Sequence, residues 1–474
     1  MKLDEIQAAA NVAAVAAAQA AQAAQAADTV APADPHPLPP PPLAAGSAGA
    51  RRRIAIISEH ASPLAAPGSI DCGGQNVYVA QLARELARAG HLVDVFTRRD
   101  APEQRQVAHW HDNIRVIHVP AGPPRYVPKE QMLPHVDAFA RYVTRFARRQ
   151  PAAYDIAHAN FFMSGMVAQH LKAALGLPFV ITFHALGRVR RLAQGTADTF
   201  PTERMRIEAA LMRAADRVIA ECPQDRHDME RLYGAPLSRI AITPCGFAPD
   251  ELWPVPMPEA RARLGLDAGR FIVLQLGRMV PRKGVDTVIQ GVAMLRHRYG
   301  VDAQLLVVGG DIGGHGGDGL ELARLRSVAA DLGIAAHVRF TGQQPRAVLR
   351  DYYSAANVFA STPWYEPFGI TPVEAMACAR PVIGAEVGGI KSTVNDSVTG
   401  FLIPSRDPAA LAERLARLHR HPELARAMGE AGRRRACEHY TWRHVAAQLA
   451  AIYADVLDTA QAAAYPNHIT LRSP

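Results

Sequence analysis

Cysteine is scarce in this chain and is not arranged for pairing. The 474 residues include five cysteines, none of them in a C-x-x-C pair. They are Cys72, Cys222, Cys245, Cys378 and Cys437. An odd and scattered set argues against a disulfide framework or structural zinc, and it favours a reducing compartment.

Long hydrophobic runs and a strong charge bias are also lacking. No uninterrupted apolar run of about 18 residues occurs, so we expect no transmembrane helix. The net charge of +8 is modest for this length. A positive net charge favours binding to nucleic acid or to an anionic membrane surface, but it would equally favour a phosphorylated small substrate. The length predicts two domains plus tails.

The first 50 residues differ in composition from the rest. The stretch AAANVAAVAAAQAAQAAQAA is mostly alanine with glutamine, and a proline-rich run, PHPLPPPPL, then breaks any helix. A signal peptide is the alternative, but Asp4 and Glu5 spoil its basic start and the glutamines spoil its apolar centre. We therefore expect a disordered tail over 1–50, an ordered protein from about Arg51, and a cytoplasmic location.

The remaining chain alternates short β-rich runs with helical periods. Residues 53–58 (RIAIIS) are typical of a buried strand, and the next periodic stretch, up to Gly90, of an amphipathic helix. The pattern predicts an α/β fold of two Rossmann-like, doubly wound domains. We place these domains at 51–250 and 266–435, with a proline-rich linker at 251–265. A late amphipathic helix follows at 436–460, and a tail at 461–474.

Doubly wound sheets bind ligands beyond the carboxyl ends of their strands, so the residues after each strand are candidates for a site. The first such loop is PGSIDCGGQN (67–76). Gly73 and Gly74 allow close backbone approach, and the following helix offers its amides to an anion. The loop is neither G-x-G-x-x-G nor a P-loop. A tight strand-to-helix turn explains the glycines equally well.

A histidine and a group of arginines follow another strand. His184 comes directly after the apolar run PFVITF and should lie at the sheet edge. A lone histidine is more often a satisfied structural residue, but this position favours a functional one. Basic residues cluster behind it, namely Arg188, Arg190, Arg191, Arg204 and Arg206. Solvated surface arginines are the simple alternative to a phosphate site.

Two basic residues follow the first strand of the second domain. In LQLGRMVPRKGVD, Arg278 and Lys283 stand five residues apart on a loop that leads into a helix. Basic groups near a helix N-terminus oppose the helix dipole. An anionic ligand such as a diphosphate would offset that disadvantage.

Two glutamates flank the loop in WYEPFGITPVEAMA (364–377). Thr371, Pro372 and Glu374 fit the start of a helix with a capping box. Capping does not explain Glu366, which precedes a proline in an aromatic loop. A carboxylate there suits a sugar hydroxyl or a developing positive charge.

Together these segments resemble a known family. The stretch YEPFGITPVEAMACARPVIGAEVGGIKSTVNDSVTGFLI is similar to the donor signature of the retaining glycosyltransferases of family four, which have the GT-B fold. GRMVPRKGVD resembles that family's diphosphate loop, and PGSIDCGGQNVYVAQLARELARAGH its glycine loop. SEHASPLAAPG and HANFFMSG point to the subgroup of sucrose-phosphate synthase and the inositol-phosphate transferase of mycothiol synthesis. The resemblance spans about 53–457.

The resemblance implies a retaining hexosyltransferase that uses a nucleotide sugar, most simply of the UDP-glucose type, and a small acceptor. His184 and Glu366 would act at the transferred sugar. The donor would be held by Gly74, Arg278, Lys283, Phe368, Gly369 and Glu374. The acceptor side would comprise His60, Asn76, Lys129 and Arg204. No tightly bound cofactor and no metal site are implied, although Mg²⁺ is compatible. In relatives the last helix crosses back to the first domain.

The sequence also departs from those relatives. Where the inositol-phosphate enzymes carry a tyrosine and a threonine at the acceptor, this chain has Phe161 and Ala185. We therefore expect a different acceptor, and Lys129 and Arg204 suggest a phosphorylated one.

Two other functions stay open at this point. A nucleotide-sugar epimerase of the same fold would need carboxylates at the strand ends of the first domain, and none is obvious there. A non-catalytic scaffold would bind nucleotide sugars or nucleic acid through the basic surface. The transferase agrees best with all motifs, without a nucleic-acid partner; the oligomeric state stays unknown.

Overall fold

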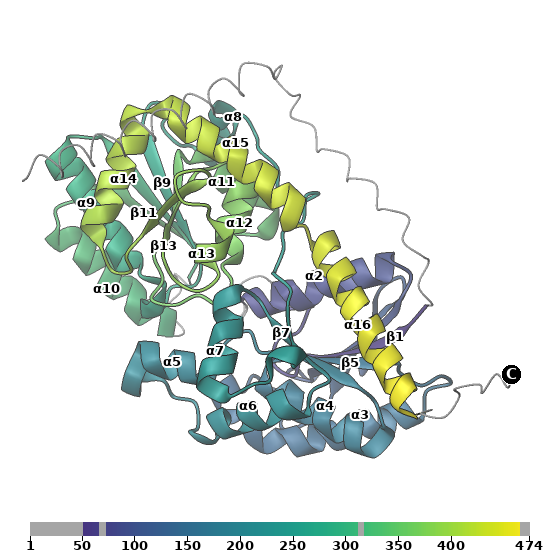
Figure 1. Ribbon diagram of the computed structural model, residues 1–474. Coiled ribbons are helices and arrows are strands. Elements are labelled where there is room, and N and C mark those ends of the chain that lie inside the picture. The colour runs from purple at the N-terminus through teal and green to yellow at the C-terminus, as the bar shows by residue number, and fades with distance from the viewer. Residues whose placement is uncertain (1–50, 66–72, 311–316, 465–474) are drawn as a thin grey trace, which may run out of the picture. The chain divides into compact units, whose positions relative to one another are not determined.

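The computed structural model describes residues 51–65, 73–310 and 317–464 (Figure 1). The predicted tail at 1–50 lies outside these residues, as do Cys72, most of the glycine loop and the chain beyond 464.

The N-terminal lobe is built on one twisted sheet. Within the described residues its strand order is β3-β4-β2-β1-β5-β6-β7-β8, and only β3 runs antiparallel to its neighbour. The strands are β1 (Arg53–Ile57), β2 (Leu92–Arg98), β3 (Val107–His111), β4 (Ile114–Val119), β5 (Ile156–Asn160), β6 (Phe179–Thr182), β7 (Arg217–Ala220) and β8 (Ile240–Ile242). The helices are α2 (Gly74–Arg88), α3 (Val136–Arg148), α4 (Phe162–Leu175), α5 (Gly187–Gln194), α6 (Glu203–Ala214) and α7 (Pro223–Tyr233).

Strand β1 shows why this sheet lies between two layers of helices. Alternate side chains of a strand point to opposite faces. Ile54 and Ile56 join one buried cluster with residues of α2, whereas Ala55 and Ile57 join another with residues of α3 and α4. A continuous apolar run in a parallel strand is therefore buried on both faces.

The edge strand β3 is absent from the sequence prediction. Its five residues, VAHWH, are all half-buried or exposed and include two histidines. An edge strand with one solvent-exposed face has no continuous apolar run by which its sequence could be recognised as a strand.

The C-terminal lobe repeats the design with an all-parallel sheet, in the order β11-β10-β9-β12-β13-β14. The strands are β9 (Phe271–Leu276), β10 (Ala303–Val308), β11 (Val338–Gly342), β12 (Val358–Ser361), β13 (Val382–Ala385) and β14 (Gly400–Ile403). The helices are α8 (Met257–Leu264), α9 (Val285–Tyr299), α10 (Gly317–Asp331), α11 (Arg346–Ala355), α12 (Ile370–Ala377), α13 (Ile390–Thr393), α14 (Pro408–Arg420) and α15 (Pro422–His439). Helix α8 thus lies within the predicted linker.

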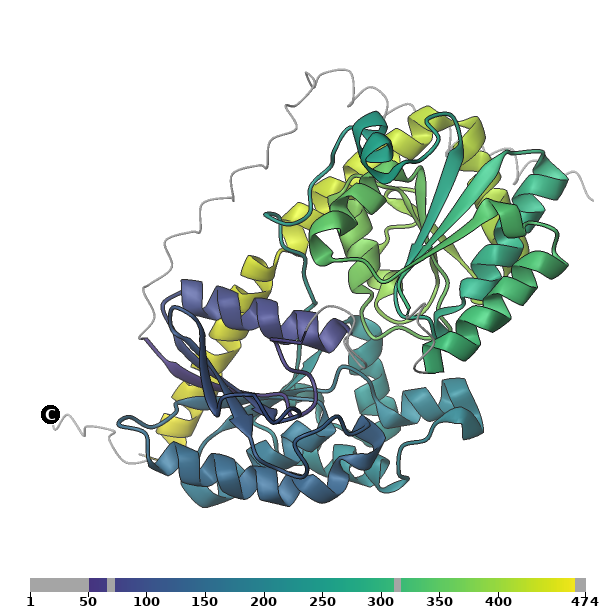
Figure 2. The same cartoon turned by 180° about the vertical axis from the view of Figure 1, so that it is seen from behind.

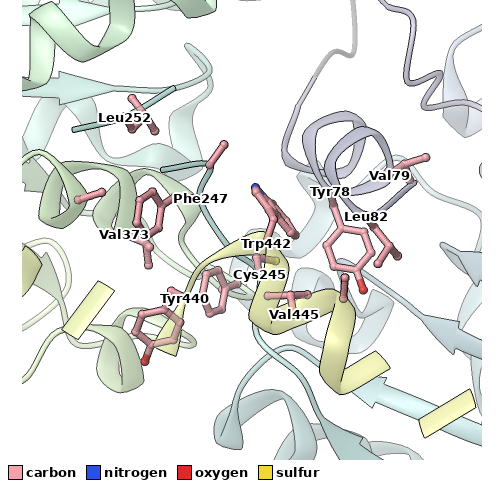
Figure 3. Close-up of a cluster of buried hydrophobic side chains, with 14 of the residues drawn as sticks. Tyr78, Val79, Leu82, Cys245, Phe247, Leu252, Val373, Tyr440, Trp442 and Val445 are labelled. Carbon is pink, nitrogen blue, oxygen red and sulfur yellow. The ribbon is translucent and has the colours of Figure 1, made fainter. Parts of the chain in front are cut away.

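The last helix, α16 (Trp442–Ala464), packs back onto the N-terminal lobe (Figure 2). Its buried residues share one hydrophobic cluster with Tyr78 and Leu82 of α2 and with Phe247 of the connecting stretch (Figure 3). The predicted GT-B architecture, with two Rossmann-like domains and a returning C-terminal helix, is confirmed. A break at Tyr440 and Thr441 separates α16 from α15.

Candidate functional site

The loop after β9 carries both basic residues predicted to hold a diphosphate. Arg278 lies two residues beyond β9, and Lys283 ends the short 3-10 helix η5 (Pro281–Lys283). Gly284 caps α9 at φ +64°, and the Oγ1 of Thr362 donates to its carbonyl oxygen at 2.8 Å. The loop therefore places two basic side chains at the N-terminus of α9, a position that favours an anion.

Gly284→Ala should destabilise the protein and weaken donor binding. A Cβ at this position would lie 2.0 Å from the carbonyl oxygen of Thr362, in addition to the cost of a positive φ. Gly300→Ala is a matched control, because Gly300 caps the other end of α9 at φ +67° with nothing within 4 Å. Thermal unfolding should show the larger loss for Gly284→Ala. Equal losses would mean that the contact with Thr362 is unimportant.

Lys283 and Glu366 form an ion pair with each other. Burial lowers the pKa of Lys283, although the neighbouring Glu366 carboxylate opposes this. Burial alone would raise the pKa of Glu366, but the Lys283 ammonium and the Arg282 guanidinium bring it below its ordinary value. The residues predicted to hold the leaving diphosphate and the transferred sugar therefore meet as a charged pair.

The glycine loop of the N-terminal lobe reaches the same place. A Cβ built on Gly73 would lie 3.8 Å from the Cδ of Arg278, and one on Gly74 would lie 3.4 Å from the Cδ1 of Ile370. Asn76 fixes this turn, because its Oδ1 accepts from the Gly73 amide at 3.0 Å. The glycine backbone of the N-terminal lobe therefore lies beside the basic loop of the C-terminal lobe.

Glu374 does not form the predicted capping box. Helix α12 begins at Ile370, with Gly369 at the cap, so Thr371 lies inside the helix and caps nothing. Glu374 is buried and accepts hydrogen bonds from Arg346 at 3.0 Å and from the Tyr353 hydroxyl at 2.8 Å. Burial, and then the Glu374 carboxylate, raise the pKa of Tyr353 well above its ordinary value. The carboxylate is held from the side by α11.

A glycine pair sets the early start of α12. The amide of Gly389 donates to the carbonyl oxygen of Glu366 at 3.0 Å, and a Cβ on Gly389 would lie 2.2 Å from the carbonyl oxygen of Phe368. Gly369 takes φ +93°, which favours glycine. The Phe368 side chain is buried against Tyr440, with ring centroids 5.9 Å apart. Phe368 therefore has only its backbone to offer a ligand.

His184 is held on both sides at the carboxyl end of β6. Its Nδ1 lies 3.0 Å from the Oε1 of Glu221, and its Nε2 lies 3.0 Å from the Oδ1 of Asn160. The Tyr78 ring packs against the imidazole in a T-shaped arrangement, with the two ring centroids 4.8 Å apart. His184 takes φ +58°, which is unusual for a residue with a side chain. These contacts fix the orientation of the imidazole at the sheet edge.

The view that the N-terminal strand ends lack carboxylates is wrong. Glu221 directly follows β7, and Glu59 lies two residues beyond β1. Both are buried and hold histidines: Glu221 binds His184, and Glu59 binds His60. Both glutamates were visible in the sequence, but their pairing with histidines was not, because it depends on how the fold orients the side chains.

Three of the predicted acceptor residues line one cavity of about 340 Å³ at the ends of β1 and β2. They are His60, Asn76 and Lys129, and Glu59, Arg98 and Asp100 join them. The volume suits a ligand the size of a small sugar.

Arg204 is not among the residues that line this cavity. It is 1% exposed, and its Nε donates to Glu208 at 2.7 Å. In the neighbouring group, Arg190 pairs with Asp198 at 2.9 Å. The predicted arginine cluster is thus at least partly committed to ion pairs within the N-terminal lobe.

A second cavity, of about 270 Å³, adjoins Glu366. Its lining includes Asp225 and Asp228 of α7, and Lys391 of α13. Burial, followed by the nearby Glu221 carboxylate, raises the pKa of Asp225 well above its ordinary value. Sequence reasoning missed these residues because they lie within helices rather than directly after strands.

No metal site is found in the described part of the chain, where no three His, Cys, Asp or Glu side chains are grouped to hold an ion. Asp311 and His315 of the glycine-rich stretch 309–319 lie outside it. Among the described helices, none has the length and apolar character needed to cross a bilayer.

The sequence is similar to known glycosyltransferases over most of its length. Residues 72–251 match the family described as Glycosyltransferase Family 4, and residues 256–435 match Glycosyl transferases group 1. A D-inositol 3-phosphate glycosyltransferase of Acidothermus cellulolyticus is 39% identical over 385 residues, which are 79% of this chain and 85% of that protein. One from Thermobispora bispora is 35% identical over 86% of this chain and 95% of that protein.

Solved structures give the same relationship. Sucrose-phosphate synthase from Thermosynechococcus elongatus has 34% sequence identity and a TM-score of 0.80, covering 86% of this chain and all of that one. The Anabaena protein HepE, solved with UDP and glucose, shares the fold at 20% identity and a TM-score of 0.67, covering 85% of this chain and 100% of its own. The chain therefore belongs to the group 1 glycosyltransferases, with the GT-B fold and an amino-terminal family 4 domain.

Proposed function

We propose that this glycosyltransferase moves a hexosyl group from a nucleotide sugar of the UDP-glucose type to a hydroxyl group of a small sugar or polyol, with retention of configuration. The observation that carries the proposal is the Lys283–Glu366 pair beside Arg278 and the glycine loop. It joins an anion-binding position to a carboxylate that accepts sugar hydroxyls. The UDP and glucose bound by HepE, which shares this fold, support this donor.

The donor roles follow from the side chains and backbone at this position. Arg278 and Lys283 neutralise the diphosphate, and Gly74 leaves room for its close approach. Glu374 accepts the ribose hydroxyls, while the Phe368 and Gly369 backbone and Glu366 face the sugar. The proposal includes no tightly bound cofactor.

His184 assists the transfer from the N-terminal lobe. The acceptor oxygen bonds to the anomeric carbon on the face that the diphosphate leaves, and the electron pair of the broken bond goes to the diphosphate. A diphosphate oxygen takes the acceptor proton, so no flanking carboxylate pair of the glycosidase type is required. His184, fixed by Glu221 and Asn160, lies on the side of the transferred sugar and helps to position it.

We also place this reaction in the cytoplasm. The cysteines in the described part of the chain are free thiols, as is usual in a reducing compartment. These are Cys222, Cys245, Cys378 and Cys437.

A thermal-shift screen with UDP-, ADP- and GDP-sugars tests the donor proposal. One nucleotide family should raise the melting temperature, because a ligand that binds only the folded state stabilises it. The matching nucleoside monophosphate is the control, since it lacks the phosphate that Arg278 and Lys283 would share. Stabilisation by no nucleotide sugar at millimolar concentration would contradict the proposal.

A further inference from the structure

The cavity that holds His60, Asn76 and Lys129 is electrically balanced. Two carboxylates, Glu59 and Asp100, and two cations, Arg98 and Lys129, belong to its lining. Their formal charges cancel. A phosphate monoester would bring close to two negative charges into this cavity, whose lining has no net positive charge to balance them.

Glu59 and His60 form a buried dyad on one wall of the cavity. Glu59 is 2% exposed, accepts from the Ser164 hydroxyl through Oε2, and lies 2.7 Å from the His60 Nδ1 through Oε1. A carboxylate only accepts, so the proton of a neutral His60 lies on Nδ1. Its Nε2 is then a hydrogen-bond acceptor, for which the structure gives no partner among the described residues. Such a nitrogen suits a hydroxyl group of the substrate, which can donate to it.

Arg98 is a poor phosphate ligand, although it lines the cavity. Its Nη1 donates to the carbonyl oxygens of Arg99 at 3.1 Å and Pro123 at 2.7 Å, and its Nη2 donates to that of Arg125 at 2.6 Å. The side chain holds the backbone of this loop together. Arg98 is thus not ready to share a phosphate with Lys129.

Arg204 is committed elsewhere and is shielded. Its Nη2 donates to the carbonyl oxygen of Ala185, in addition to its ion pair with Glu208. Three phenylalanine rings surround its guanidinium at 4.4 to 5.1 Å, those of Phe161, Phe162 and Phe200. The remaining Nη1 is buried without a hydrogen-bond partner, and a ligand that reached it would have to displace part of these aromatic surroundings.

We propose that the acceptor is an uncharged polyhydroxy compound, a free sugar or polyol, and that Arg204 is a structural residue rather than a phosphate ligand. The inference rests on the proposed transferase function. It replaces the phosphorylated acceptor suggested by the basic residues in the sequence. Glu59 is then a positioning residue that keeps the His60 Nε2 ready to accept from an acceptor hydroxyl.

Matched pairs of acceptors test this directly. Transfer from the donor found by thermal shift is measured for myo-inositol against D-inositol 3-phosphate, and for fructose against fructose 6-phosphate. The same four compounds are titrated by calorimetry with the full chain, with and without donor. We expect the uncharged member of each pair to have the higher kcat/KM and the tighter binding, by about tenfold or more, because the cavity has no net positive charge to balance a phosphate that must leave water.

Preference for either phosphorylated compound, in turnover or in binding, would overturn the inference. Binding titrations need no turnover, so the comparison stands even if no acceptor in the panel is glycosylated. Failure of every nucleotide sugar to bind would instead contradict the donor proposal. The two failures are therefore distinguishable.

Glu59→Gln adds a test of the dyad. The introduced amide can donate to the His60 Nδ1, which moves the imidazole proton to Nε2. The Nε2 can then no longer accept a hydrogen bond from the substrate. We expect the KM for the uncharged acceptor to rise about tenfold while the donor Kd stays the same, with a changed pH profile. Glu103→Gln, at an exposed carboxylate outside the cavity, should change neither constant. An unchanged acceptor KM in a folded Glu59→Gln variant would overturn the role of the dyad.

Discussion

Lys283→Met should lower kcat/KM by roughly a hundredfold or more, because a cation that neutralises the leaving group acts mainly in the transition state. The loss should appear in kcat as well as in donor affinity. Lys172→Met is the charge-matched control. Lys172 pairs with Asp216 on the outer side of the N-terminal lobe, so activity should be unchanged.

Lys283→Met should also destabilise the protein, which could be mistaken for the cause of lost activity. Without the ammonium, Glu366 is a buried carboxylate without its ion pair, at a cost on the order of 3 kcal/mol. The double variant Lys283→Met/Glu366→Gln removes both charges and should recover most of the lost stability. It should recover none of the activity. Activity that returned together with stability would show that Lys283 is structural.

Trp442→Ala should cause the largest loss of stability among single substitutions of α16. Trp442 is 1% exposed within the cluster of Figure 3, and its amide donates to the Phe247 carbonyl at 3.0 Å. Removing a buried tryptophan costs about 3–5 kcal/mol. For a chain of this size, we expect the melting temperature to fall by roughly 5 °C. Trp110→Ala, on the edge strand β3, is a matched control that should cost much less.

Truncation before Tyr440 extends the same prediction. The carbonyl of Tyr440 accepts from the Phe247 amide at 2.8 Å, and Tyr453 lies 2.6 Å from the Nδ1 of buried His158 through its hydroxyl. The shortened chain would expose the apolar face that α16 covers on α2. We expect it to be unstable or inactive. A truncated enzyme with normal stability and activity would refute the tethering role of α16.

Much of the fold could be predicted because strand burial follows the period of the sequence. The apolar runs at β1 and β6 locate the sheet edge, and residues just beyond them, such as His184, are brought to it by topology alone. Likewise, the basic loop after β9 had to lie at a helix N-terminus.

The sequence-based predictions were least accurate for side chains that could pair with any of several groups. Glu374 satisfied a capping pattern, yet Tyr353 and Arg346 of α11 hold it, because the turn at Gly369 starts the helix earlier. Arg204 was indistinguishable from a surface arginine, since two of the three rings around it, those of Phe161 and Phe162, come from a distant segment. Period and composition do not encode such pairings.

The most direct measurement of the central claim is proton NMR of the product formed from an α-linked nucleotide sugar and the preferred uncharged acceptor. The coupling between H1 and H2 of the transferred hexose reports the configuration at its anomeric carbon. We expect an α-glycoside, formed together with one equivalent of nucleoside diphosphate. A β-glycoside, or a converted sugar without any acceptor adduct, would contradict it.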